Sequence, residues 1–190
     1  MQIHYLAACS SFIALLASGT QVIAIEARSL VGISYYRNPA DRGKPIEESR
    51  WIGLPQGTQL TYGGLLDRNI DLPQRFGYQG LKIGNQKFIV FELISNFPDG
   101  YTYNRVLGAV ETTGTALFHP CTLHGNEDPE IIAILTPEEL ASVSMQNPNR
   151  MDGIEAVVAS PQNVFRLNRK TLSIDAVEGS AATCKGWPEF

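Results

Sequence analysis

The sequence has none of the short motifs that identify the large nucleotide-binding and hydrolase families. A GxSxG elbow, a GxxxxGK[ST] phosphate loop, a GxGxxG loop and an HExxH zinc helix are all missing from its 190 residues. Histidine is scarce, since the chain holds only three. His119 and His124 stand near Cys121, but two histidines cannot complete a three-histidine metal site. We therefore expect neither a metal nor a cofactor.

The sequence also has no excess of basic residues. Lys and Arg number 15 against 19 Asp and Glu, which gives a formal net charge of −4. This balance argues against a generally basic DNA-binding protein, although a local basic site for RNA remains compatible with it. With 44% hydrophobic and 18% charged residues, the composition is that of a globular domain rather than a disordered polypeptide or a coiled coil.

The N-terminal segment has the pattern of a secretory signal peptide. Leu6 to Leu16 form an apolar stretch, and Val22-Ile23-Ala24 supply short residues at the spacing of a cleavage site. The stretch is too short and too often interrupted to span a bilayer well. We predict a signal peptide at 1–24, one secreted domain at 25–190 and no membrane association. The alternative is an apolar N-terminal strand or helix of the fold.

Cysteine is equally sparse. Removal of the signal peptide leaves Cys121 and Cys184, an even number in an oxidising compartment. A disulfide between them is the simplest expectation, and two buried free thiols are the alternative. Neither cysteine belongs to a CxxC pair, which argues against a zinc site or a redox dithiol.

Gly and Pro are spread evenly along the sequence, as is typical of many short strands joined by turns. Lys87 to Ser95 (KFIVFELIS) is the most apolar segment after the signal peptide and predicts a central strand. We expect further strands at 29–36, 101–110, 114–118, 130–135, 154–159, 163–167 and 171–177.

Two short helices are expected among these strands. Thr136 can cap a helix, Pro137 suits its first position and Glu139 completes a capping box, so we predict a helix that runs to about Met145. A second short helix is predicted at 44–52. The fold class that follows is α+β, with an antiparallel sheet packed against one or two short helices.

One set of polar residues could carry chemistry on such a sheet. Glu92, Arg105 and His119 fall on or at the ends of successive predicted antiparallel strands and would share a face if the register allows. A carboxylate, a guanidinium and an imidazolium together can cleave RNA by general acid–base catalysis. The alternative is structural: Glu92 and Arg105 form a cross-strand pair, and His119 ends a strand.

The order of these residues resembles the fungal guanyl-specific ribonucleases and the secreted ribonuclease-like effectors of powdery mildew fungi. The matching segments are Tyr78-Gln79-Gly80, Phe91-Glu92-Leu93, Asn104-Arg105-Val106-Leu107 and Leu117-Phe118-His119. The resemblance implies a ribonuclease-like fold, with Glu92 as general base, Arg105 as the phosphate-binding group and His119 as general acid. It also implies that Tyr78 and Gln79 contact an RNA base.

The sequence departs from that family at several positions, among them Phe76-Gly77, which stand where the family has a pair of Asn residues. No histidine stands near Leu72-Pro73-Gln74, and Gln79 replaces the acidic residue that holds the guanine edge. Our leading hypothesis is therefore a catalytically inactive effector that binds host RNA or a host protein. The alternatives are an active ribonuclease that uses Glu92 and His119, and a secreted α+β binding protein of unrelated fold. Whether the protein is an enzyme stays open at this point.

These hypotheses share one set of further expectations. The protein is expected to be secreted and to act either outside cells or inside a host cell after delivery. We expect it to be a monomer and to bind neither DNA nor membranes.

Overall fold

The computed structural model describes residues 25–67, 72–97, 101–114, 116–146 and 155–186, so the predicted signal peptide lies outside the described residues. Within the described residues the protein forms fifteen strands in three antiparallel sheets, with one five-residue α-helix and four short 3-10 turns. The α+β prediction, with its ribonuclease-like sheet and helices, is therefore wrong. The fold is all-β, because the predicted helices shrink to single turns between strands.

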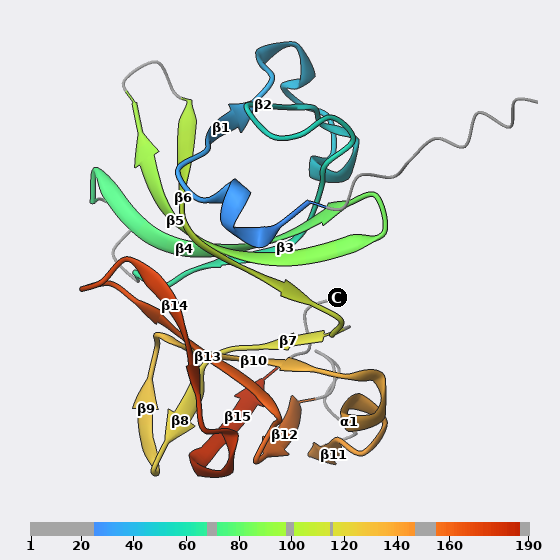
Figure 1. Cartoon of the computed structure of the whole chain (residues 1–190), viewed down its shortest axis with the longest axis vertical. Coiled ribbons are helices and arrows are strands. Elements are labelled where there is room, and N and C mark those ends of the chain that lie inside the picture. The colour runs from blue at the N-terminus through green and yellow to red at the C-terminus, as the bar shows by residue number, and fades with distance from the viewer. Residues whose placement is uncertain (1–24, 68–71, 98–100, 115, 147–154, 187–190) are drawn as a thin grey trace, which may run out of the picture.

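The N-terminal half is one curled six-stranded sheet in the order β2-β1-β6-β5-β4-β3 (Figure 1). Its strands are β1 (Ser34–Arg37), β2 (Trp51–Ile52), β3 (Gln59–Leu65), β4 (Gln74–Ile83), β5 (Gln86–Asn96) and β6 (Thr102–Thr112). The 3-10 turn η1 (Ala27–Leu30) lies inside the curl. We call the face that covers η1 the inner face of this sheet, and the opposite face the outer face.

The C-terminal half consists of two smaller sheets that face each other (Figure 1). The four-stranded sheet has the order β14-β13-β10-β7, from β7 (Ala116–Phe118), β10 (Ile131–Leu135), β13 (Asn163–Asn168) and β14 (Ser173–Val177). The five-stranded sheet has the order β11-β12-β15-β8-β9, from β8 (Cys121–Leu123), β9 (Asn126–Asp128), β11 (Ser144–Gln146), β12 (Glu155–Ala159) and β15 (Ala182–Gly186).

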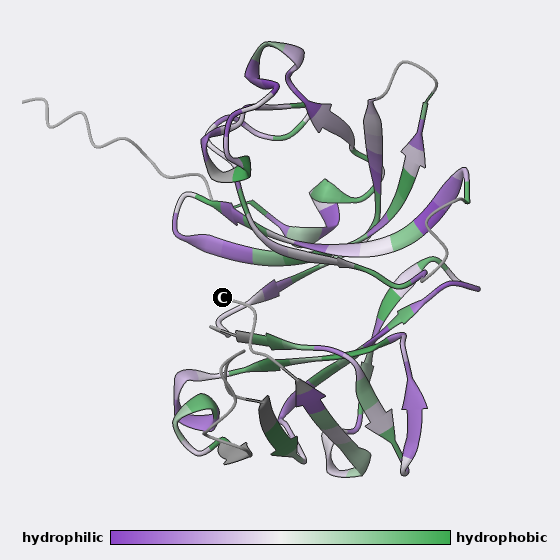
Figure 2. Ribbon diagram, turned by 180° about the vertical axis from the view of Figure 1, so that it is seen from behind, coloured by the Kyte–Doolittle hydropathy of each residue, from purple (hydrophilic) through white to green (hydrophobic). Residues whose placement is uncertain are grey.

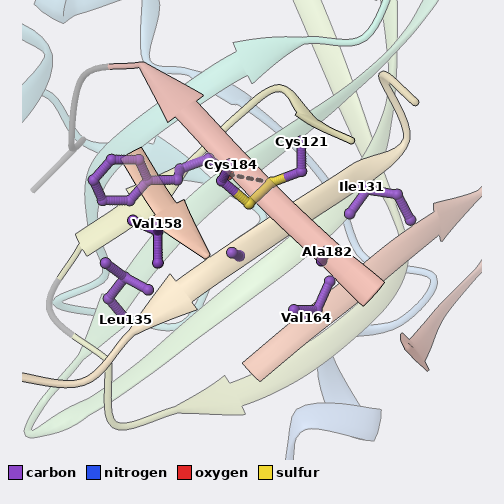
Figure 3. Close-up of a cluster of buried hydrophobic side chains, with 9 residues drawn as sticks. Cys121, Ile131, Leu135, Val158, Val164, Ala182 and Cys184 are labelled. Carbon is purple, nitrogen blue, oxygen red and sulfur yellow. Dashed lines mark hydrogen bonds between the residues drawn. A yellow bond between two sulfur atoms is a disulfide. The ribbon is translucent and has the colours of Figure 1, made fainter. Parts of the chain in front are cut away.

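Strand β10 ties the three sheets together because it is buried on both faces. Ile131, Ala133 and Leu135 point into the core shared with the five-stranded sheet, around the disulfide (Figure 3). Ile132 and Ile134 point the other way, into a core shared with the outer face of the six-stranded sheet. Side chains alternate along a strand, so an unbroken apolar strand needs a partner layer on each side. Figure 2 shows hydrophobic stretches on the strands where the two halves meet.

Several local predictions are confirmed. The KFIVFELIS segment forms β5, and the apolar run before Thr136 forms β10. The capping box is present, since Thr136 Oγ1 accepts from the Glu139 backbone N–H at 3.2 Å and Glu139 Oε2 accepts from the Thr136 N–H at 2.9 Å. Helix α1 (Pro137–Ala141) is shorter than predicted, because strand β11 begins at Ser144 rather than after a longer helix.

Other local predictions are wrong. The helix predicted at 44–52 is only a 3-10 turn, η3 (Ile46–Glu48), followed by strand β2. The strand predicted at 29–36 begins only at Ser34, because η1 occupies the preceding residues. Strands β3 and β4 are absent from the prediction, since their glycines and polar residues hide the alternation of apolar side chains.

The predicted disulfide between Cys121 and Cys184 is present and joins neighbouring strands of the five-stranded sheet (Figure 3). The two residues stand directly opposite each other in the β15–β8 register, with a Cα–Cα distance of 4.1 Å. Both side chains are buried in the core beside β10. The disulfide closes a loop with a sequence separation of 63 residues, which encloses most of the C-terminal half.

Replacing both cysteines by alanine should lower the free energy of unfolding by about 4 kcal/mol, because the unfolded state regains the entropy of a long open loop. Urea unfolding of the variant and of the oxidised wild type measures this difference. The reduced wild type serves as the control and should resemble the variant. A loss below about 1 kcal/mol would contradict a stabilising role for this bond.

Candidate functional site

Glu92 is buried on the inner face of the six-stranded sheet. Its side chain is only 3% exposed, and Tyr35 Oη donates a hydrogen bond to Glu92 Oε2 at 2.5 Å. Burial raises the pKa of the Glu92 carboxyl from its ordinary value of 4.5 to about 7, and the Tyr35 hydrogen bond opposes this rise only in part. The pKa of Tyr35 is also raised, by burial and then by the neighbouring carboxylate. The pair is thus sealed within the sheet's own core.

Arg105 lies on the other face of the same sheet. In the β5–β6 register Glu92 stands opposite Val106, whereas Arg105 stands opposite Leu93. Residues directly opposite each other share a face, and neighbours along a strand do not. Arg105 is exposed, and its side chain leaves the sheet on the side away from the buried carboxylate. The structure does not bring these two predicted catalytic groups together.

His119 follows β7 and lies beneath the outer face. Its Nε2–H donates to the Pro129 carbonyl at 2.8 Å, and its ring packs against Tyr78 with the centroids 5.3 Å apart. Tyr78 pairs with Phe91 and points into the core between the sheets, where it is 2% exposed. The sheet itself therefore separates His119 from Glu92.

The predicted base-contacting pair also divides between the two faces. Tyr78 points to the outer face, and its neighbour Gln79 points to the inner face. Gln79 Nε2 donates to the Tyr62 carbonyl at 2.6 Å and to the Gly80 carbonyl at 3.2 Å, so its amide holds β3 against β4. Of the five residues predicted from sequence, the structure brings together only His119 and Tyr78, and their contact is structural packing.

A different set of polar and aromatic residues lines a cavity at the end of the six-stranded sheet that carries β1 and β2. Figure 1 shows the position of these strands in the sheet. The cavity has a volume of about 330 Å³, and we call it the arginine–tryptophan pocket. Its lining residues are Arg37, Asn38, Pro39, Arg42, Ile46, Trp51, Tyr101, Thr102 and Asn104.

Strand register explains why residues far apart in the sequence meet in this pocket. Arg37 stands opposite Trp51 in the β1–β2 pair, and Tyr35 stands opposite Asn104 in the β1–β6 pair. Tyr35 and Arg37 are two residues apart on β1, so all four side chains share the inner face. One wall of the pocket thus comes from the segment Tyr35 to Pro39, and the other comes from β6.

The loop that closes the pocket, residues 38–50, is braced by a buried carboxylate. Asp41 is fully buried and accepts hydrogen bonds from the Arg50 backbone N–H at 3.0 Å, from Arg50 Nε at 2.8 Å and from Lys44 Nζ at 2.6 Å. These bonds, first from Arg50 and then from Lys44, hold the pKa of Asp41 well below its usual range. Asn38 adds a cap, since its Oδ1 accepts from the Ala40 N–H at 3.0 Å.

The two arginine side chains of the pocket differ in how firmly hydrogen bonds hold them. Arg37 is fixed, because its Nε donates to Ser49 Oγ at 2.8 Å and its Nη2 donates to the Lys44 carbonyl. Arg42 is exposed at the rim. Neither guanidinium forms an ion pair with a carboxylate among the described residues. The pocket therefore holds two guanidinium groups that have no ion-pair partner in the described part of the protein.

The floor of the pocket is connected to the buried Glu92. Trp51 packs edge-on against Tyr35, with the ring centroids 5.8 Å apart, and Tyr35 donates to the carboxyl of Glu92. The Trp51 indole N–H is buried without a hydrogen-bond partner among the described residues. Glu92 is thus connected through Tyr35 to Trp51, the ring that a ligand in the pocket would contact.

An aromatic strip lies on the outer face of the same sheet end. Tyr36 and Tyr103 stand opposite each other with ring centroids 4.9 Å apart, and Phe97 meets Tyr103 edge-on at 4.9 Å. Phe97 is 51% exposed. The backbone N–H of Phe97 donates to the carbonyl of Tyr101, a pocket residue, so the strip lies next to the segment that carries Tyr101, although on the opposite face of the sheet.

A second cavity, of about 470 Å³, lies beside helix α1 in the C-terminal half. It is lined by Glu139, Ser142, Val143 and residues 157–162, with no basic or aromatic side chain among them. Within the described residues no group of three or more His, Cys, Asp or Glu side chains is placed to hold a metal ion. The arginine–tryptophan pocket is consequently the better candidate for recognition.

Sequence reasoning misses this pocket because no motif marks it. Arg37 and Trp51 are 14 positions apart in the sequence, and Asn104 is far from both. The one local signal is the apolar, aromatic run that ends at Tyr36, which by itself indicates only a strand. Its role depends on the β1–β6 pairing, which joins the first strand to the last strand of the sheet.

Replacing Glu92 by Gln should change how stability depends on pH. The native state binds the Glu92 proton more tightly than the unfolded state does, so wild-type stability from this group is full below pH 4.5 and is lost as pH rises to about 7. Gln keeps the shape without the charge. The free energy of unfolding of the variant, measured relative to that of the wild type, should therefore be about 3 kcal/mol higher at pH 8 than at pH 4. Urea unfolding at both pH values measures it, and a pH-independent difference would contradict a buried, titrating Glu92.

Comparison with protein-family models, with curated proteins and with solved structures finds no match to this protein. Among the described residues no helix has the length and apolar character needed to cross a membrane. The assignment of the arginine–tryptophan pocket as the candidate site rests on its geometry: a braced loop, an aromatic floor and two guanidinium groups without carboxylate partners in the described residues.

Proposed function

We propose that this is a secreted binding protein without catalytic activity, which recognises another protein through the arginine–tryptophan pocket. The observation that carries the proposal is the pocket itself, in which Arg37, Trp51, Tyr101 and Asn104 surround one cavity behind a braced loop. Arg, Trp and Tyr are the residues most enriched at the energetic centres of protein interfaces. The apolar segment before residue 25 supports export.

The positions of the acid–base groups support binding rather than catalysis. Glu92 is sealed in the inner core, and His119 lies on the opposite side of the sheet against Tyr78. General acid–base catalysis needs both groups within hydrogen-bond reach of one substrate. With the sheet between them, a shared substrate position would require the six-stranded sheet to open.

The charge and apolar character of the surface favour a protein partner over RNA. The net charge is −4, and the pocket contributes two guanidinium groups rather than a basic track. Binding of a nucleic-acid strand depends on several phosphate contacts along such a track. Ile46, which lines the pocket, is 54% exposed, and Phe97 of the aromatic strip at the same end of the sheet is 51% exposed. Exposed apolar patches mark interaction sites, and aromatic residues and Arg are enriched in protein interfaces.

Purified protein spanning residues 25–190 and its Glu92→Gln variant should both leave single-stranded RNA intact across pH 4 to 8, because the acid and the base share no substrate space. Gel analysis of a labelled oligonucleotide measures this, with an active ribonuclease in the same buffer as the positive control. Cleavage by the wild type that disappears in the Glu92→Gln variant would overturn the non-catalytic assignment.

Arg42→Glu should weaken binding to the partner protein by at least about tenfold, since it replaces a cation of the pocket by an anion. The partner is first captured with the wild-type protein and then purified, so that affinities are measured directly by calorimetry. Lys185→Glu makes the same change of charge on β15, far from the pocket, and should bind as the wild type does. Equal affinities for wild type and Arg42→Glu would place the interface elsewhere.

A further inference from the structure

The arginine–tryptophan pocket joins positive charge to an apolar floor, and this combination narrows the chemistry of its ligand. On the basis of the proposed function, we infer that the pocket receives a carboxylate of a partner peptide segment together with one neighbouring apolar side chain of that segment. The carboxylate belongs either to an Asp or Glu residue or to the free C-terminus of the partner. These two sources share one chemistry and are separated by the experiment below.

The charge argument begins with the loop that bears Arg42. Asp41 beside it is already neutralised, because Arg50 and Lys44 both donate to its buried carboxylate. Arg37 uses its Nε and Nη2 in fixed bonds, and the residue lines the pocket. A planar guanidinium binds a carboxylate through parallel hydrogen bonds, and a fixed one loses little entropy in doing so. One carboxylate that accepts hydrogen bonds from both Arg37 and Arg42 would offset one of their two positive charges.

The apolar argument rests on the remaining walls. Trp51, Tyr101, Pro39 and Ile46 line the same cavity, so a ligand that carried charge alone would leave their surface uncovered. A volume of about 330 Å³ is at the small end of ligand pockets, which gives room for one or two side chains. The occupant is therefore a short segment rather than a folded surface.

The side-chain amide of Asn104 indicates that the ligand includes a peptide backbone. It is 9% exposed and lines the cavity from β6. A side-chain amide offers a donor and an acceptor side by side, which matches the N–H and C=O of an extended peptide. A phosphate or a sulfate could use only the donor. An acidic peptide segment uses all three kinds of wall, namely the arginines, the aromatic floor and the amide.

The test titrates designed peptides against the protein and follows the fluorescence of Trp51. Trp187→Phe removes the only other tryptophan of the sequence, so the signal comes from the pocket. Three hexapeptides carry the same apolar residues. The first has an internal Glu and an amidated C-terminus, the second has Gln and a free C-terminus, and the third has Gln and an amidated C-terminus. A fourth probe is a single-stranded RNA hexamer.

We expect the first or the second peptide to change the Trp51 emission saturably, at least about tenfold more tightly than the third, because only these two carry a carboxylate. The one that binds identifies the source of the carboxylate. Arg42→Glu should abolish this preference and Lys185→Glu should keep it, with both variants shown to be folded by their urea midpoints. Equal binding of all three peptides, no binding of any, or tighter binding of the RNA hexamer would overturn the inference.

This outcome is separable from that of the proposed function. If binding of the partner protein depends on Arg42 but no carboxylate peptide binds, the binding function stands and the carboxylate assignment is overturned. If Arg42→Glu alters neither partner binding nor peptide binding, both are overturned.

Discussion

Strand β10 sets the constraint on which the rest of the fold depends. Its five residues, Ile131 to Leu135, are all buried and have no polar side chain. Because they alternate between two faces, the four-stranded sheet must be covered on both sides. The five-stranded sheet covers one side and the outer face of the six-stranded sheet covers the other. Most of the outer face is thereby used for packing, and Tyr78 and His119 become part of that contact.

With the outer face so occupied, the end of the six-stranded sheet that carries β1 and β2 is left for recognition. Apolar side chains around Tyr35 and Val90 form a core that covers most of the inner face. At the end of the sheet where β1, β2 and β6 meet, the inner face instead carries polar and aromatic side chains. The loop there is held by the buried carboxylate of Asp41, so the pocket is formed before any partner arrives. A preformed site loses little conformational entropy on binding, which favours specific recognition by a small cavity.

Local patterns predicted much of this structure, and long-range pairing decided the rest. The strands at Lys87 to Ser95 and Glu130 to Leu135, the Thr136–Glu139 capping box and the Cys121–Cys184 disulfide all follow from short stretches or from residue counts. The helix expected at 44–52 was overridden by pairing of Trp51 with Arg37. The predicted site required Glu92, Arg105 and His119 to lie on the same face of the sheet. The bulge between Phe91 and Glu92 changes the strand register, so counting residues along the sequence does not give the face on which each side chain lies.

The claim that the arginine–tryptophan pocket is the working surface is tested most directly by hydrogen–deuterium exchange of the protein with and without its captured partner. Protection on binding should fall on residues 37–51 and 101–104, and strands β8, β9 and β15 of the five-stranded sheet should exchange as they do in the free protein. Protection confined to the C-terminal half, with the loop 38–50 unchanged, would contradict it.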